Sequence, residues 1–233
     1  MTSLLLIPLD DTVVFPTMDV TLPVDTGEEE RVLLVPRHGS EFAAVGTIAA
    51  VTDAVRMPGG GRAVQLSGVA RGVVGAGSSD SQGRLFVEVE ERTDDIPVDG
   101  RTRQAEREYR AVVEEILELR GADRRVADFL RAIGDPGPLA DTIGYAPDVA
   151  FEEKVEVLET LDVTERLELA VRLQKERMAE LQIRRRIRED VQSGAEKQQR
   201  EYILRKQMDS IRRELGDDDA SVVEEYRAKI EDA

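Results

Sequence analysis

The chain has 233 residues, of which 41% are hydrophobic and only 4% are aromatic, and its formal net charge is −16. It contains no cysteine, which excludes disulfides, thiolate metal sites and a cysteine nucleophile, and fits a reducing compartment. Its apolar runs are too short for a signal peptide or for a membrane helix, which needs about 20 residues. We therefore expect a cytoplasmic globular protein of one or two domains with an aliphatic core.

Charge is unevenly distributed along the chain. Residues 1–100 carry 16 acidic and 7 basic side chains, whereas residues 165–215 carry 10 acidic and 14 basic ones. Because an acidic surface repels phosphate backbones, nucleic acid is an unlikely partner for the first part of the chain. Only 5 of the 32 basic residues are lysine, a bias typical of GC-rich genomes.

Residues 1–95 have the pattern of a β domain. Short runs rich in β-branched or alternating apolar residues are separated by prolines and by the glycine-rich stretches at 58–61 and 75–83. Residues 84–91 alternate between apolar and polar side chains, as in a half-buried antiparallel strand. We predict an all-β domain over residues 1–95, either a sandwich or a partly open barrel.

The pattern becomes helical after a break at residues 94–102, because apolar side chains then recur every three or four residues. It predicts a helical bundle over residues 102–162. Gly121 is a plausible C-cap, and Pro138 suits the first turn of a short helix. The expected helices cover 105–119, 124–133, a short segment from Pro138, and 148–161.

A long helix is predicted over residues 163–216. Asp162 and Glu165 have the spacing of a capping box at its start. Ser193–Gly194 is its weakest point, where we expect a kink or a joint. A further helix is predicted to begin within residues 217–233, and the sequence stops inside it. We therefore expect the sequence to be part of a longer chain. The fold class is therefore α+β.

The second part of the long helix carries a narrow apolar line. Its members recur at spacings of 4, 3 and 4, which is the pattern of a coiled coil. Two heptads alone are only marginally stable, so they need a partner helix, and we predict self-association through them. The seam residues are Leu204, Met208, Ile211 and Leu215.

No catalytic, cofactor or metal site is expected in this chain. The single histidine, His38, is most simply a loop residue, and the sequence contains no GxxxxGK[ST], HExxH or GxSxG motif. All five lysines lie in the helical half, on charged faces. The composition therefore favours a binding function.

The loop at residues 10–24 is the candidate contact site for a substrate. Phe15, Pro16 and Met18 lie between two predicted strands, where apolar side chains can form a patch for extended peptides. The alternative is that this loop packs inward as ordinary core.

The basic run at residues 184–188 has two interpretations. It could contact nucleic acid or anionic lipid, or it could be a solvated helix face paired with Glu180, Glu189 and Asp190. The sequence favours the second.

Four blocks resemble the N-terminal domain of the Lon family, in order along nearly the whole chain. Asp10 departs from the family pattern, which commonly has a basic residue there, and Ser193–Gly194 is looser than the usual charged helix. The resemblance is to bacterial members of the family, and among these to actinobacterial ones. The blocks are "IPLDDTVVFPTM" (7–18), "LADTIG" (139–144), "EEKVEVLETLDVTERLE" (152–168) and "QQREYILRKQMDSIRRELG" (198–216).

This resemblance implies a PUA-like β subdomain, a helical bundle and a long helix. The family's members are cytosolic, homohexameric AAA+ proteases that use ATP and a Ser–Lys peptidase to degrade misfolded proteins. ATP and Mg²⁺ would bind to a module outside this sequence. The implied role of this region is non-catalytic: recognition of unfolded or misfolded proteins and support of hexamer assembly.

The alternative function is a stand-alone PUA-like module that binds RNA or a small ligand. Such a module has no use for the roughly 50 helical residues after Asp162. The acidic β domain also argues against RNA.

Overall fold

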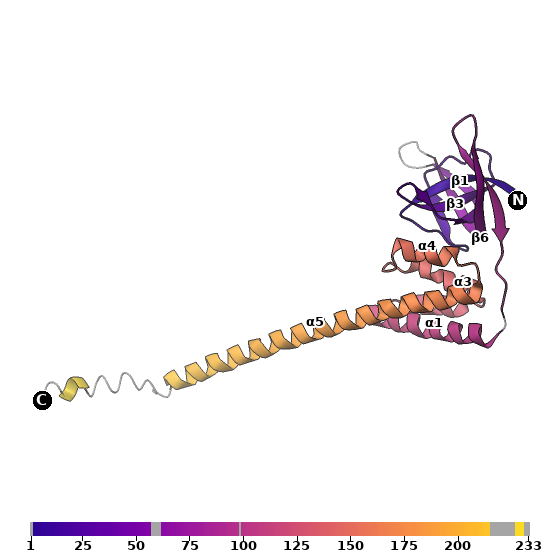
Figure 1. The fold of residues 1–233 in the computed structure, drawn as a ribbon. Coiled ribbons are helices and arrows are strands. Elements are labelled where there is room, and N and C mark those ends of the chain that lie inside the picture. The colour runs from indigo at the N-terminus through magenta and orange to yellow at the C-terminus, as the bar shows by residue number, and fades with distance from the viewer. Residues whose placement is uncertain (1, 57–61, 98, 215–226, 231–233) are drawn as a thin grey trace. The chain divides into compact units, whose positions relative to one another are not determined.

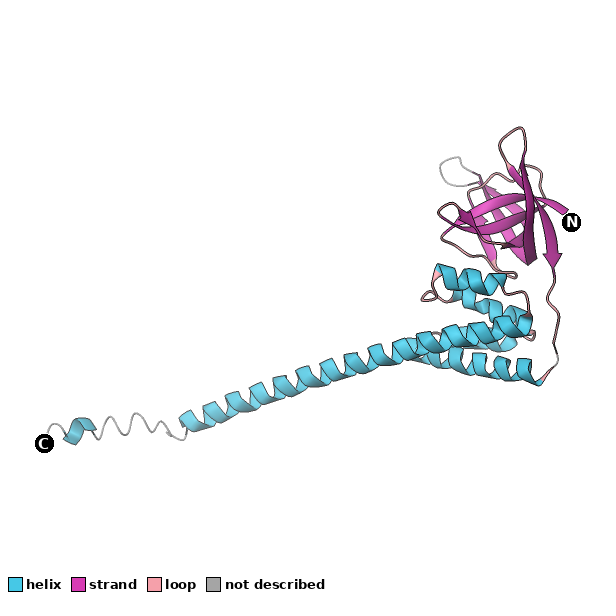
Figure 2. Cartoon of the chain, in the orientation of Figure 1, coloured by secondary structure: helices cyan, strands magenta, loops and turns pink. Residues whose placement is uncertain are grey.

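The computed structural model describes residues 2–56, 62–97, 99–214 and 227–230, and it divides the chain into two units, residues 1–181 and 182–233. The first unit begins with seven strands, shown in magenta in Figure 2. The strands are β1 (Thr2–Asp10), β2 (Asp19–Leu22), β3 (Arg31–His38), β4 (Glu41–Phe42), β5 (Val45–Arg56), β6 (Arg62–Ser79) and β7 (Leu85–Arg92).

The strands form a barrel. Neighbouring strands follow the order β1-β7-β6-β5-β3-β4, and an additional pairing joins β1 to β3. This pairing is parallel, with Leu5 opposite Val32 and Pro8 opposite Val35, whereas the other ladders are antiparallel. The sequence predicted a sandwich or a partly open barrel, and the additional β1–β3 pairing joins the two sides of the strand order.

Strands β1 and β3 are buried on both faces, which explains why their sequences read as nearly continuous apolar runs. Leu4 and Leu6 join one core cluster together with Leu33 of β3. Leu5 and Ile7 point to the other face and belong to a larger cluster that also contains side chains from the helices. The barrel and the helical region of the first unit therefore share one core.

The helices follow as predicted in order and type, with boundaries shifted by a few residues (Figure 1). Asp99 caps the first helix by accepting a hydrogen bond from the backbone N–H of Thr102, and Gly121 ends it with a φ of 65°. This agrees with the predicted glycine C-cap. The helices are α1 (Gly100–Arg120), α2 (Arg124–Ala132), α3 (Pro136–Asp141), the 3₁₀ helix η1 (Thr142–Tyr145), α4 (Phe151–Glu159) and α5 (Val163–Glu214).

Helix α5 begins at the predicted cap, where the backbone N–H of Glu165 donates to the Asp162 carboxylate at 2.9 Å. Its buried side chains all lie between Val163 and Gln174. Of the kink or joint expected at Ser193–Gly194, the joint is wrong, because α5 is helical through both residues. A glycine inside a helix lowers helix stability by only about 1 kcal/mol relative to alanine, and the good helix formers Ala195 and Glu196 follow Gly194.

The α+β class and the order of β domain, helical region and long helix are confirmed. Most of the predicted truncated helix at residues 217–233 lies outside the described residues. Within this range the structure describes residues 227–230, which are helical. Within the part of the chain that the structure describes, no helix is both long and apolar enough to cross a membrane.

Candidate functional site

The loop predicted to contact substrate is buried. Phe15 is 0% exposed and Met18 is 8% exposed, and Pro16 is also buried. The expectation of an exposed apolar patch at these side chains is therefore wrong, and the alternative of inward packing is what the structure shows. Their role as substrate contacts stays a prediction, which now requires the loop to leave its place.

Contacts from distant segments hold this loop in place. The backbone N–H of Thr17 donates to the carbonyl of Gly68 in β6 at 2.9 Å, and the N–H of Gly68 donates to the carbonyl of Met18 at 2.8 Å. A Cβ atom at Gly144 in η1 would lie 2.6 Å from the Phe15 ring, so the glycine allows close contact there. The loop therefore joins the barrel to the helices.

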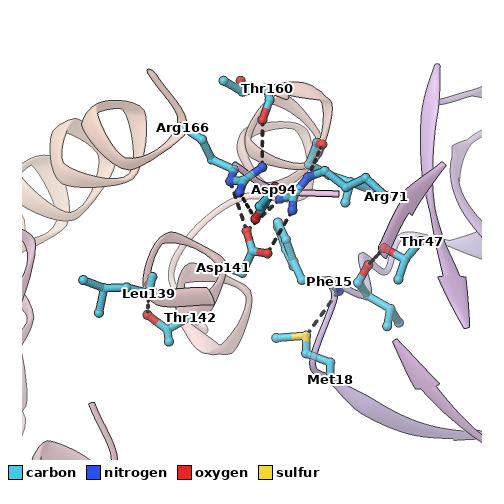
Figure 3. Close-up of polar contacts among 12 residues, drawn as sticks. Phe15, Met18, Thr47, Arg71, Asp94, Leu139, Asp141, Thr142, Thr160 and Arg166 are labelled. Atoms are coloured by element: carbon cyan, nitrogen blue, oxygen red, sulfur yellow. Dashed lines mark hydrogen bonds and ion pairs between the residues drawn. The ribbon is translucent and has the colours of Figure 1, made fainter. Parts of the chain in front are cut away.

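A buried charge cluster lies beside Phe15 (Figure 3). The Arg71 guanidinium of β6 donates two hydrogen bonds to the Asp141 carboxylate of α3, at 2.9 and 2.7 Å, and a third to the carbonyl of Leu158. The side chains of Arg71 and Asp141 are only 1% and 3% exposed. Charges this deeply buried persist only when they are paired and hydrogen-bonded.

Arg166 of α5 completes the cluster. It pairs with Asp94, which follows β7, and donates to the carbonyl of Thr160 at 3.2 Å, while its Nε lies 3.4 Å from Asp141. Burial lowers the pKa of Arg166 below that of a free guanidinium, and the nearby Arg71 lowers it further, against the attraction of Asp141.

The charge cluster, defined as Arg71, Asp94, Asp141 and Arg166, therefore joins β6, α3, α5 and the segment after β7. Its charged groups pair with one another across these elements, which is the geometry of a structural joint. Sequence reasoning missed it, because Arg71 and Asp141 stand 70 residues apart with no local pattern that links them.

An apolar groove of about 560 Å³ lies on the helical region. We call it the α1–α2 groove. Its walls are side chains of α1, α2 and the segment 142–147, and Gln174 of α5 also lines it. Three of its apolar side chains are strongly exposed: Phe129 is 57%, Tyr145 60% and Val126 46% exposed.

The polar part of the α1–α2 groove is small. Among the residues that the structure describes, its only charged lining residues are Arg120, which pairs with Asp148, and Arg125, which pairs with Asp123 at 3.2 Å. Tyr109 is fully buried beneath it and bonds through its hydroxyl to the hydroxyl of Thr142 at 2.9 Å. Burial raises the pKa of Tyr109 to about 12.

Helix α2 has few anchoring contacts, and they lie at its C-terminal end. Leu130 is its one buried side chain. The Arg110 guanidinium of α1 donates to the carbonyls of Leu130 and Ile133, at 2.5 and 2.6 Å. The sequence carried a signal for this groove. Leu130 is the side chain that α2 buries, so the apolar Val126 and Phe129 on the same short helix remain exposed.

The predicted association seam is exposed in the second unit. Leu204, Met208 and Ile211 are between 53% and 56% exposed, and their role in association stays a prediction. Leu215 lies outside the described residues. Three further exposed isoleucines of the described part of α5, Ile183, Ile187 and Ile203, were not predicted as part of the seam.

The remaining candidates have ordinary surroundings. His38 ends β3 and lies 3.4 Å from Asp11, with 71% of its side chain exposed. In the basic run, Arg185 pairs with Glu189 at 2.7 Å, which agrees with the solvated-face interpretation. Among the described residues, no three His, Cys, Asp or Glu side chains are arranged to hold a metal ion.

The family model described as "ATP-dependent protease La (LON) substrate-binding domain" matches residues 3–176, which include the barrel, the charge cluster and the α1–α2 groove. The chain belongs to the Lon family. It corresponds to the substrate-binding domain, a non-catalytic region of Lon proteases.

Curated relatives support the same placement. Lon protease from Salinispora arenicola is 37% identical over 245 residues, covering 100% of this chain and 31% of the relative. Lon protease from Mycolicibacterium smegmatis is 36% identical over 97% of this chain and 30% of the relative. The chain thus spans about a third of the length of these relatives, both of which fit the predicted actinobacterial resemblance.

Solved structures agree at the level of the fold. The N-terminal domain of Mycobacterium avium complex Lon protease superposes with a TM-score of 0.66 at 30% identity, covering 75% of this chain and 98% of that chain. The Lon N-terminal domain protein from Xanthomonas campestris gives a TM-score of 0.54 at 18% identity, which supports the fold alone.

Proposed function

We propose that this chain captures unfolded or misfolded polypeptides in its α1–α2 groove, as part of a Lon-type protease in the cytoplasm. ATP-dependent Ser–Lys proteolysis would be carried out by other modules of such a protease, arranged as a homohexamer. The observation that carries the proposal is the exposure of Phe129, Tyr145 and Val126 around one apolar concavity in the region that matches a substrate-binding domain.

The groove suits apolar segments for physical reasons. Folded proteins bury their aliphatic and aromatic side chains, whereas unfolded chains expose them, so an apolar concavity selects the unfolded state. Within the described part of the chain no carboxylate lines the groove, although acidic residues outnumber basic ones by 48 to 32 in the full sequence. An incoming apolar segment would therefore not bury an acidic group of the groove itself.

The groove proposal is tested by the binding of a reduced and alkylated model protein to Phe129→Ser and Val126→Ser variants. Each change removes apolar surface that is exposed in the free protein, so we expect binding to weaken by roughly tenfold with the fold intact. Val69→Ser is the matched control, since Val69 is 52% exposed on the barrel, away from the groove. Unchanged binding by both groove variants would reject the groove as the capture site.

We also propose that copies of the chain associate through α5. The exposed apolar side chains of the second unit support this, because an isolated apolar stripe on a charged helix is stabilised by a partner helix. Sedimentation velocity of the full chain and of a Leu204→Ser, Met208→Ser, Ile211→Ser variant tests it: the wild type should associate and the variant should not.

A further inference from the structure

Three uncharged polar side chains lie in the otherwise apolar lining of the α1–α2 groove: Tyr109, Thr142 and Gln174. Tyr109 and Gln174 are buried, at 0% and 5% exposed, and Thr142 is half-buried. Buried polar groups in folded proteins are hydrogen-bonded, so the donors and acceptors of these side chains can be followed to their partners.

The protons of this network run in one direction. The Thr142 hydroxyl donates its single proton to the carbonyl of Leu139 at 2.7 Å, so it accepts in its 2.9 Å contact with Tyr109. The single proton of Tyr109 is thereby used. Gln174 also hydrogen-bonds to the Tyr109 hydroxyl, so it must donate an amide N–H to that oxygen.

The amide of Gln174 keeps hydrogen-bonding capacity. Within the described chain, the Tyr109 hydroxyl is the one hydrogen-bond partner of this amide. A primary amide has two N–H donors and a carbonyl acceptor, so one donor and the carbonyl oxygen have no partner. With the outer N–H on Tyr109, the inner N–H and the oxygen lie side by side on one edge of the amide, in the lining of the groove.

The backbone of an extended chain offers the complementary pair of groups. Facing residues of an antiparallel ladder exchange both N–H···O bonds, so one extended residue presents its N–H and its C=O on the same side. An α-helix has already used these groups, because each interior N–H bonds to the carbonyl four residues earlier. An amide edge therefore distinguishes an extended segment from a helical one.

Building on the proposed capture of unfolded chains in this groove, we propose that Gln174 binds the main chain of one residue of an extended segment. Its carbonyl oxygen accepts from the N–H of that residue, and its inner N–H donates to the C=O. The neighbouring side chains of the segment pack on Val126, Phe129 and Tyr145, which are the strongly exposed apolar residues of the groove. Hydrogen bonds are stronger in such an apolar surrounding than in water.

The main-chain contact also bears on selectivity. Every residue except proline carries the same N–H and C=O, so the contact is independent of the side chain at the bound position. The apolar walls then select for the neighbours of that residue. The occupant is thus an extended, apolar stretch of an unfolded polypeptide.

An ester scan tests the contact, because an ester in place of one amide removes a single backbone N–H and keeps the side chains. The probe is the labelled peptide Ser-Gly-Leu-Val-Phe-Val-Leu-Gly-Ser, together with a series in which one central amide at a time is an ester. Fluorescence anisotropy measures binding to the full chain. We expect one ester position to weaken binding by roughly tenfold. A scan in which no position matters would overturn the contact.

Gln174→Met provides an independent arm, because methionine is an unbranched side chain of similar length without an amide. In this variant the sensitive ester should bind as well as the parent peptide, so the tenfold difference disappears. Gln104→Met is the matched control, since Gln104 of α1 is exposed and lies outside the groove lining. The same ester effect in Gln174→Met as in the wild type would overturn the contact, and circular dichroism checks the fold of both variants.

Phe129→Ser separates this inference from the proposed function. A parent peptide that fails to bind, or that binds Phe129→Ser as tightly as the wild type, would reject capture in the groove and the Gln174 contact with it. Binding that Phe129→Ser weakens, combined with a flat ester scan, would reject only the contact.

Discussion

Arg71 and Asp141 show how a single buried pair can hold the barrel against the helices. The pair joins β6 to α3, and Arg166 and Asp94 extend it to α5 and to the segment after β7. Such a pair contributes little net stability compared with apolar residues of the same size, because both charges lose their hydration. We expect the pair to act mainly on specificity, because any misplacement of one side chain leaves an unpaired charge in the core.

The first residue-scale prediction is that Asp141→Asn destabilises the chain by about 3–5 kcal/mol, because Arg71 and Arg166 then keep uncompensated buried charge. Chemical denaturation followed by circular dichroism measures this free energy of unfolding. Combining Asp141→Leu with Arg71→Met should cost less than the sum of the two single changes. Additive costs would show that the two side chains do not act as a pair.

The second residue-scale prediction concerns alkaline pH. The folded state raises the pKa of Tyr109 to about 12, above the ordinary value near 10. Tyr109 therefore contributes its full stabilisation to the free energy of unfolding below about pH 10. This contribution of roughly 3 kcal/mol is lost as the pH rises toward 12. Denaturant midpoints at several alkaline pH values measure this loss.

Tyr109→Phe is the control for the alkaline prediction. It removes the ionisable group, so the part of the pH dependence due to Tyr109 should disappear, although the hydrogen bond to Thr142 is lost at all pH values. An equally steep alkaline decline in this variant would show that other groups cause it.

At the scale of elements, the loop after β1 and the 3₁₀ helix η1 are fitted to each other. The position of Gly144 leaves no room for a Cβ, which would lie 2.4 Å from Met18 and 2.6 Å from Phe15. We expect Gly144→Ala to lower the free energy of unfolding by about 1–3 kcal/mol through overpacking. Gly134→Ala is the control, because no atom lies within 4 Å of the added Cβ there. If the Gly144→Ala variant and the wild type melted at the same temperature, the close packing of the loop against η1 would be contradicted.

The sequence predicted the elements well where the signals were local. Gly121 was expected as the C-cap of α1, and Asp162 as the N-cap of α5, because capping depends on residues within one turn. The parallel β1–β3 pairing that closes the barrel was not predicted, since both strands read as apolar runs whatever their partners. Pairing of this kind depends on long-range packing.

The candidate site was predicted less well for the same reason. Phe15 is a plausible surface residue when only its own loop is considered, and its burial results from Gly68 and Gly144, which lie far along the chain. The α1–α2 groove is assembled from α1, α2 and the segment 142–147, so no single stretch of sequence describes it. The seam on α5 was predictable because its residues repeat within one helix.

At the scale of the whole molecule, the chain combines two kinds of surface in separate units. The first unit holds the α1–α2 groove on a region fixed by a shared core and by the charge cluster. The second unit holds exposed apolar side chains on α5, through which we propose association. The proposed capture and the proposed association therefore involve different residues, and we expect variants of one surface to leave the other unaffected.

The most direct test of capture is hydrogen exchange of the full chain with and without a reduced and alkylated model protein. If the groove holds the unfolded segment, protection should increase in residues 105–133 and 142–147 and remain unchanged in the barrel. Protection confined to the barrel loop at residues 10–24, with no change in α1 and α2, would contradict the assignment of the groove.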